Sequence, residues 1–191
     1  MNNSIQITRR SFLQSTGTLV IAAGMPGLVL SQTTTLPTNL ARNPDLDSWL
    51  QINTDGSISV SSGKCEIGQG IQTALAQIVA DELEVDINRL EMRNVDTSYS
   101  PDEGATTGSN SVQQSGSALR VATADARRLL LENAASQLGH PIDQLSVDDG
   151  RVTASSSTDS ISYWELLADG NFDTQANGAG EPKDPELYRY V

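Results

Sequence analysis

The segment from Gly63 to Thr73 reads GKCEIGQGIQT and separates a strand-like segment from a helix-like one. A turn of this kind leaves the first backbone N–H groups of the helix without intrahelical partners. The helix dipole adds partial positive charge there, which favours an anion such as a phosphate. Gly68 and Gly70 lack the Cβ atoms that would keep a ligand from the backbone. Between them, Gln69 can donate and accept hydrogen bonds. The segment therefore predicts a turn that binds a polar or anionic ligand.

Alternating and helical patterns on both sides of this turn predict the surrounding fold. Residues 49–53 and 57–61 alternate as strands around an Asp55-Gly56 turn, which is a hairpin signal. Apolar residues recur with helical spacing over 71–83, and we expect Asp81 and Glu82 on the solvent side of that helix. Residues 90–95 alternate again. The predicted fold is a layered α/β (α+β) arrangement, with a mixed sheet packed by two main helices.

A second loop, residues 96–111, is rich in Gly, Ser and Thr and opens a long helix that reaches about Leu138. Ser and Asn side chains can satisfy the free N–H groups of a first helical turn, so structural capping alone could account for this loop. If the neighbouring strands lie side by side, however, both loops emerge at one sheet edge. One ligand could then be held from two sides, with hydroxyl groups of Thr106, Ser109 and Ser111 added.

Several further features are predicted with structural roles. Residues 145–153 form a second hairpin, and residues 160–167 form a short amphipathic helix. We expect Cys65 to be buried within a strand over residues 60–67, and His140 to lie in the loop after the long helix. Glu66 could serve function or a structural hydrogen bond.

The chain divides into four predicted parts. Residues 1–31 contain a twin-arginine pattern around Arg9-Arg10, then a short apolar run, and resemble a Tat export signal. That signal predicts a periplasmic protein without a transmembrane segment, because the apolar run is too short. Residues 32–44 are predicted as an extended linker, 45–168 as the folded segment, and 169–191 as a linker to a downstream domain that this chain lacks.

The charge balance excludes one class of ligand. The formal net charge is −12, and without the two arginines of the signal 10 basic residues face 24 acidic ones, a balance of −14. Nucleic acid is therefore not an expected partner, because contacts with its phosphates need Lys and Arg. An NAD-binding domain is a weak alternative, because no Gly-x-Gly-x-x-Gly follows a strand.

Two separated motifs carry a family resemblance. Residues 63–74 (GKCEIGQGIQTA) and 78–83 (IVADEL) resemble the molybdopterin-binding segment of the xanthine dehydrogenase and aldehyde oxidase family. The large (beta) subunits of isoquinoline 1-oxidoreductase-like enzymes are the most similar branch. Residues 96–97, 104–109 (GATTGS) and 116–118 continue the match in the same order. The resemblance covers roughly residues 47 to 140.

The resemblance implies molybdenum hydroxylase chemistry on an N-heterocycle or aldehyde. It implies a molybdenum–molybdopterin cofactor, in the cytosine dinucleotide form typical of bacterial members, a small 2Fe-2S subunit that takes the electrons, and a small-molecule substrate. Carried over, the glycine-rich turn would contact the pterin or its dithiolene side, and the second loop would hold the pterin and phosphate. The implied cofactor-binding residues are Gly68, Gln69, Gly70, Thr106, Gly108, Ser109, Asn110 and Ser111.

The chain also departs from the family pattern. Family large subunits are several times longer, and their catalytic glutamate lies far downstream in a Gly-x-Gly-Glu motif. Residues 178–181 read GAGE but fall in the expected linker, so no catalytic residue and no metal ligand is assigned. We expect this chain alone not to turn over, and the remainder of the large subunit to be a partner if it is separately encoded. A truncated, non-catalytic remnant or interaction module is the alternative.

Overall fold

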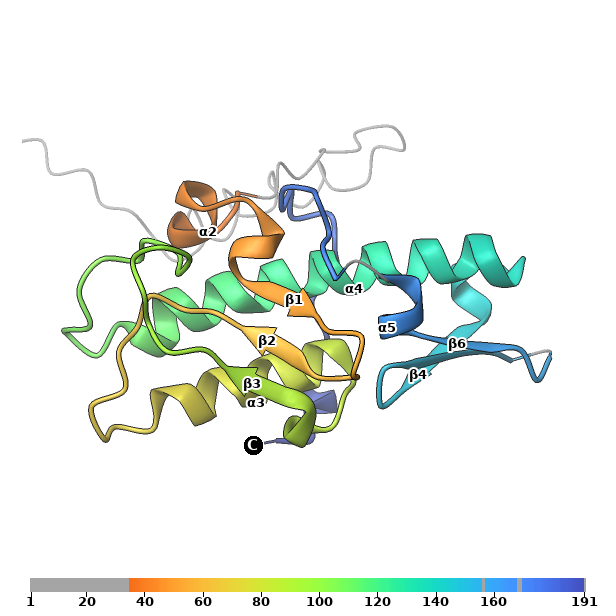
Figure 1. The fold of residues 1–191 in the computed structure, drawn as a ribbon, viewed down its shortest axis with the longest axis horizontal. Helices are drawn as coiled ribbons and strands as arrows, with labels where there is room; N and C mark the ends of the chain where they lie inside the picture. Colours follow the sequence, from red (N-terminus) through yellow and green to blue (C-terminus); the bar gives the residue numbers. More distant parts are fainter. Residues whose placement is uncertain (1–34, 156, 168–169, 191) are drawn as a thin grey trace, which may run out of the picture. The chain divides into compact units, whose positions relative to one another are not determined.

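The structure is a computed structural model that describes residues 35–155, 157–167 and 170–190. The predicted export signal lies outside these residues. The described chain contains two three-stranded sheets and two long helices (Figure 1). The elements in chain order are α2 (Thr38–Arg42), η2 (Leu46–Ser48), β1 (Leu50–Ile52), β2 (Ile58–Val60), α3 (Ile71–Leu83), η3 (Ile87–Arg89), β3 (Leu90–Met92), η4 (Ser111–Gly116), α4 (Ser117–Leu138), η5 (Ile142–Gln144), β4 (Leu145–Asp148), β5 (Arg151–Ala154), β6 (Ser160–Ser162), α5 (Tyr163–Leu166) and η6 (Pro185–Leu187).

The first sheet has the order β1-β2-β3 and is mixed, as predicted. β1 and β2 form the antiparallel hairpin, with Leu50 opposite Val60. β3 runs parallel to β2, with Ile58 opposite Leu90. The connection between these parallel strands contains α3, as a parallel pair requires a crossover. This topology sends the chain out of β2 and β3 at the same end of the sheet.

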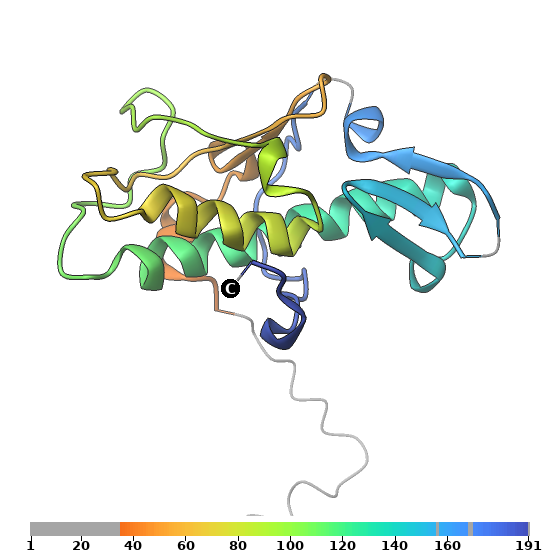
Figure 2. The same ribbon diagram turned by 90° about the horizontal axis from the view of Figure 1, so that it is seen from below.

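The two predicted helices pack against each other and against this sheet (Figure 2). The face of α4 with Ala118, Ala122 and Ala126 is fully buried, and the small side chains let the helices approach closely. At Gly116 an added Cβ would lie 3.0 Å from Cδ1 of Ile78, so the end of that side chain would have to shift to make room even for a methyl group. Ahead of α4, η4 is a π-helical turn, a feature that often occurs at functional sites.

The second sheet, β4-β5-β6, is antiparallel and lies near the C-terminal end of α4 (Figure 1). β4 and β5 confirm the predicted second hairpin. The prediction of a helix over residues 160–167 was wrong in its first part, because residues 160–162 pair with β5 as β6. The helix begins only at Tyr163, where Ser162 and Glu165 form a capping box.

Residues 35–44 differ from the predicted extended linker. They contain α2, whose Leu40 is fully buried in the core. The indole N–H of Trp49 donates to the carbonyl oxygen of Asn43 over 2.8 Å, which fixes the segment against η2. Pro37 and Pro44 flank this helix and do not interrupt it.

The expectation that Asp81 and Glu82 face solvent was wrong, since each is 1% exposed. The segment 183–190 covers that side of α3. Asp81 accepts the backbone N–H groups of Arg189 (2.7 Å) and Tyr190 (3.1 Å). Glu82 accepts the N–H of Lys183 over 2.8 Å. Segments about one hundred residues apart in sequence thus bury two carboxylates that the helical pattern places outside.

Asp125 of α4 fixes the preceding part of the same segment. Its carboxylate accepts the backbone N–H groups of Asn177, Gly178 and Gly180 at 2.6–2.8 Å. A Cβ at Gly180 would lie 2.3 Å from the backbone of Ala124, so only glycine permits this approach. Residues 177–190 are therefore packed against α3 and α4. No helix among the described residues has the length and hydropathy to cross a membrane.

Candidate functional site

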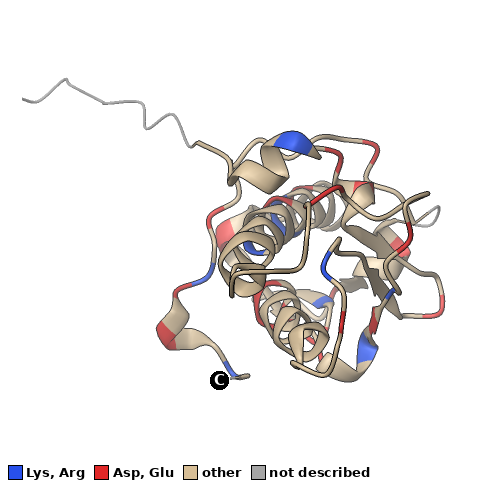
Figure 3. Cartoon of the chain, turned by 90° about the vertical axis from the view of Figure 1, so that its left-hand side faces the viewer, with Lys and Arg blue, Asp and Glu red and all other residues tan. Residues whose placement is uncertain are grey.

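The two glycine-containing loops, residues 63–73 and 96–111, lie together at the end of the first sheet where β2 and β3 both end, on the left in Figure 1 and facing the viewer in Figure 3. The backbone N–H of Cys65 donates to Oγ1 of Thr106 over 2.9 Å. The ammonium group of Lys64, which is 2% exposed, donates to the carbonyl oxygens of Glu103 (2.8 Å) and Ala105 (3.3 Å). The expectation that both loops share one sheet edge is confirmed.

Glu103 is the residue on which this junction depends. It is 5% exposed, and its carboxylate accepts hydrogen bonds from Nδ2 of Asn39, Oγ of Ser62, the N–H of Gly63 and Oγ of Ser115, all at 2.8–2.9 Å. Four donors satisfy a carboxylate that would otherwise be costly to bury. One side chain therefore ties α2, the exit of β2 and η4 to the second loop.

Gly63 allows the loops to touch. An added Cβ would lie 2.4 Å from the carbonyl oxygen of Pro101 and 3.1 Å from the backbone nitrogen of Glu103. Since backbone cannot move aside as a side chain can, any other residue at 63 would separate the two loops.

The turn before α3 differs from the expectation that its N–H groups are free. Gly68 and Gly70 take positive φ values of 95° and 76°, which glycine tolerates without strain. The carboxylate of Glu66, however, accepts the N–H groups of Gly68 (2.7 Å), Gly70 (3.0 Å) and Gln72 (3.2 Å). These hydrogen bonds to the charged form lower the pKa of Glu66, the one from Gly70 contributing most. Glu66 therefore has a structural hydrogen-bonding role in this turn.

Gln69 is held within the same turn. Its Oε1 accepts the N–H of Ile67 over 2.6 Å, and its Nε2 donates to the carbonyl oxygen of Cys65 over 2.8 Å. The expectation of a buried Cys65 was wrong, because β2 ends at Val60 and Cys65 is an exposed free thiol. The contact of the two loops diverts the chain from the strand before position 65.

The second loop differs from this turn in its backbone conformation and in having polar side chains without hydrogen-bond partners among the described residues. Gly104, Gly108 and Ser109 have positive φ values of 66°, 63° and 57°, so the chain curls into η4. Asn110 stands at the N-cap position of η4 but its side chain makes no capping hydrogen bond. Within the described part of the chain, the hydroxyl groups of Ser109 and Ser111 also have no hydrogen-bond partner. Structural capping therefore does not account for these side chains.

The electrostatic character of the second loop differs from that of the rest of the chain. Residues 104–119 contain no charged side chain, although the whole chain has a net charge of −12. The nearby Glu103 is buried and fully hydrogen-bonded. The exposed acidic side chain beside this stretch is that of Asp102, whose carboxylate accepts the backbone N–H of Gly104 over 3.1 Å.

Two hollows flank the loops. A pocket of about 430 Å³ is bounded by Gly63, residues 95–97 and residues 100–104. Another of about 510 Å³ lies between α2 and the start of α4, beside Gln113, Gln114 and Ser117. The eight predicted site residues line neither pocket and lie on the adjoining loops. The site is thus an open surface in the described chain.

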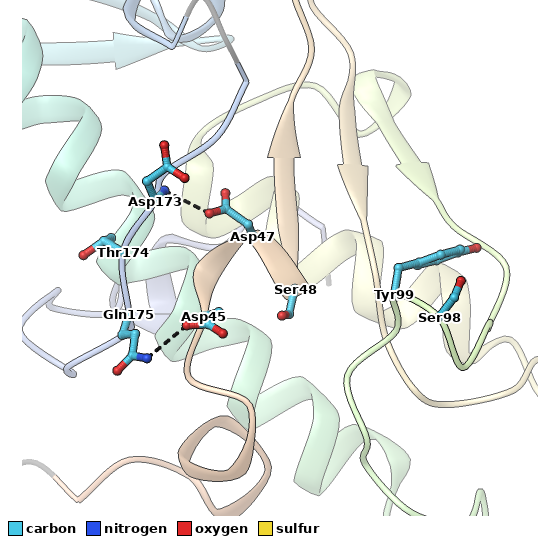
Figure 4. A pocket seen from close by; sticks show the side chains of 8 residues that line it. All are labelled: Asp45, Asp47, Ser48, Ser98, Tyr99, Asp173, Thr174 and Gln175. Atoms are coloured by element: carbon cyan, nitrogen blue, oxygen red, sulfur yellow. Dashed lines mark hydrogen bonds between the residues drawn. The ribbon is translucent and has the colours of Figure 1, made fainter.

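A pocket of about 670 Å³ lies elsewhere and involves none of the predicted residues (Figure 4). Two of its three acidic side chains are used structurally: Asp47 accepts the N–H groups of Phe172 and Asp173, and Asp45 accepts from Nε2 of Gln175. Among the residues that the structure describes, no group of three His, Cys, Asp or Glu side chains could hold a metal ion. The pocket is lined by Asp45, Asp47, Ser48, Ser98, Tyr99, Asp173, Thr174 and Gln175.

A family model described as "Molybdopterin cofactor-binding domain" matches residues 15–185. The chain belongs to this family. One of the subunits of nicotinate dehydrogenase from Pseudomonas putida is 36% identical over 194 residues, which is 100% of this chain and 16% of that protein. The beta subunit of isoquinoline 1-oxidoreductase from Brevundimonas diminuta is 30% identical, over 86% of this chain and 22% of its own length. The chain thus spans about a fifth or less of the length of these relatives.

The fold of this molybdopterin cofactor-binding domain also agrees with a solved structure. CO dehydrogenase from Oligotropha carboxidovorans superimposes with a TM-score of 0.54 and 27% identity, over 61% of this chain and 15% of that chain. The layered α/β fold and the family predicted from residues 63–83 and 96–118 are confirmed. The assignment of individual cofactor contacts stays a prediction.

The sequence reasoning missed Lys64 and Glu103, which lie inside the two loops but received no role. No local pattern identifies them, because the partners of Glu103 come from positions 39, 62, 63 and 115. The only local signal for these two residues was a charged side chain next to a glycine in each loop.

Proposed function

We propose that this chain is the cofactor-binding part of a molybdenum hydroxylase, an oxidoreductase that hydroxylates an N-heterocycle or an aldehyde. The observation that carries the proposal is the contact between the two motif loops, from Cys65 N–H to Thr106 and from Lys64 to Ala105, within a chain of the molybdopterin cofactor-binding family. Nicotinate and isoquinoline, in the names of the two relatives, are N-heterocycles.

The residues present fit a large polar cofactor. The backbone at Gly68, Gly70 and Gly104 has nothing within 4 Å of where a Cβ would stand, so a ligand could approach it closely. Gly68, Gln69 and Gly70 would contact the pterin or its dithiolene side. The second loop would hold the pterin and phosphate through Thr106, Gly108, Ser109, Asn110 and Ser111. The cofactor supplies the redox chemistry, and these residues bind and orient it.

The finer form of the cofactor is also proposed. A cytosine dinucleotide form adds phosphate groups, which suit a loop with unpaired hydroxyl groups and no acidic side chain over residues 104–119. Since this stretch also lacks Lys and Arg, hydroxyl and backbone N–H groups would have to hold the phosphates.

The partners and location follow from the same proposal. We propose that the rest of the large subunit and a small 2Fe-2S subunit complete the enzyme, and that the substrate is a small molecule bound outside this chain. The Arg9-Arg10 pattern supports Tat export of a folded, cofactor-loaded protein to the periplasm.

Metal and pterin analysis tests the proposal. The full chain would be purified with the remaining subunits from a host that makes the cofactor, in parallel with an intact relative. We expect molybdenum and pterin near equimolar with the chain. Their absence, under conditions that load the relative, would contradict a cofactor role and favour a non-catalytic interaction module.

A further inference from the structure

The N-terminus of α3 is filled by a carboxylate from its own chain. Oε1 of Glu66 accepts the N–H groups of Gly68 and Gly70, and Oε2 accepts the N–H of Gln72. Gly70 is the N-cap of α3 and Gln72 lies in its first turn, where the helix dipole favours negative charge, while Gly68 lies in the turn just before. A bound phosphate would have to displace Glu66.

The side chain of Gln69 closes the same turn. Both ends of its amide are used within the loop, one by the N–H of Ile67 and the other by the carbonyl oxygen of Cys65. Glu66 and Gln69 thus accept the N–H groups of Ile67, Gly68, Gly70 and Gln72 from inside the turn.

The second loop shows the opposite arrangement. The hydroxyl groups of Ser109 and Ser111 have no partner in the described chain, and the side chain of Asn110 does not cap η4. No charged side chain lies between residues 104 and 119. An anion therefore finds unused donors at this loop, whereas the carboxylate of Glu66 would repel it at the other.

We propose that Glu66 is a positioning residue that occupies the α3 turn, excludes phosphate from it, and leaves the anionic end of the cofactor to residues 104–111. The proposal rests on the proposed function for the identity of the ligand. The occupation of the three N–H groups is a property of the chain itself.

A phosphate titration followed by amide NMR tests this assignment on the full chain. In the wild type we expect inorganic phosphate to leave the amide signals of Gly68, Gly70 and Gln72 unshifted. Glu66→Ala should open the turn, and these signals should then shift saturably as phosphate is added. Glu91→Ala, which removes an exposed carboxylate on β3, should behave as the wild type. Equal phosphate responses in wild type and Glu66→Ala, whether both shift or neither does, would overturn the proposal.

A pH titration distinguishes a hydrogen-bonding role of Glu66 from a purely space-filling one, because only the first responds to protonation of the carboxylate. The same three amide signals should change together, with a midpoint below the ordinary pKa of a glutamate, because their hydrogen bonds lower the pKa of Glu66. In Glu66→Gln the common transition should be absent. If none of these three amide signals changes at acid pH in the wild type, the proposal is contradicted.

Metal analysis keeps the two proposals separate. Wild-type protein without molybdenum would contradict the proposed function, while the phosphate and pH titrations would still decide the role of Glu66. If the wild type is loaded, Glu66→Ala should lose cofactor faster during dialysis than Glu91→Ala. Equal loss would contradict a positioning role.

Discussion

At the scale of single residues, the buried carboxylate of Glu103 joins parts of the chain that are far apart in sequence. Its partners lie on α2, at the exit of β2 and in η4. A buried group that loses its hydrogen-bond partner costs about 1–3 kcal/mol, and several donors depend on this one carboxylate.

Glu103→Ala should therefore lower the free energy of unfolding by at least about 3 kcal/mol. Urea denaturation of the wild type, Glu103→Ala and Glu103→Gln measures the effect. The glutamine retains one acceptor oxygen, so its loss should be smaller. Glu132→Ala, which removes an exposed carboxylate on α4, is the matched control and should change the free energy little. An unchanged denaturation midpoint for Glu103→Ala would contradict the role of this junction.

At the scale of elements, the segment 177–190 belongs to the fold although its composition suggested a linker. Buried carboxylates of α3 and α4, from Asp81, Glu82 and Asp125, accept its backbone N–H groups. Such attachment confers order on a segment without regular secondary structure.

Asp125→Ala should release the first part of this segment. The N–H groups of Asn177, Gly178 and Gly180 would lose their acceptor, so their hydrogen exchange should accelerate by at least about tenfold. Exchange measured by mass spectrometry or NMR would show it. Asp143→Ala, at an exposed position in η5, should leave exchange in residues 177–190 unchanged. Unaltered exchange in Asp125→Ala would mean that the segment is held by other contacts.

The attachment of the last described residues to α3 should also weaken at high pH. The hydroxyl of Tyr188 donates to Oε1 of Glu82 over 2.5 Å, and burial together with this carboxylate raises the pKa of Tyr188 to about 12. Because the folded-state pKa lies above the unfolded value near 10, the protonated form stabilises the fold fully below pH 10, and this stabilisation is lost as pH rises towards 12.

Tyr188→Phe removes the titrating hydroxyl, so the variant should lack this pH-dependent part of the unfolding free energy. Unfolding free energies measured across the alkaline range should fall less steeply for the variant than for the wild type. Tyr163, whose pKa is also raised by burial, is present in both proteins and cancels in the comparison. Identical pH dependence in the two proteins would contradict the role of Tyr188.

At the scale of the whole molecule, the elements could be predicted from sequence where their patterns are local. The hairpin around Gly56, the helices α3 and α4, and the strand β3 follow from spacing over a few residues. Burial of Asp81, exposure of Cys65 and the network of Glu103 could not be predicted, because each depends on a segment distant in sequence. The positions of the motif loops could be predicted from the sequence. The occupation of the α3 turn by Glu66 could not.

The central claim is that the two loops together hold a molybdopterin cofactor, with the anionic end at the second loop. Ser109→Asp tests this most directly. Aspartate tolerates the positive φ at this position, so the variant adds a negative charge with little backbone strain. Ser136→Asp adds the same charge at an exposed position on α4, away from both loops, and is the matched control.

The measurement is the molybdenum content per chain of the assembled protein, with folding checked by thermal unfolding of each variant. The account predicts at least about a tenfold loss of molybdenum in Ser109→Asp, because like-charge repulsion acts where the phosphate would bind, and wild-type content in Ser136→Asp. A folded Ser109→Asp protein with wild-type molybdenum content would contradict the account.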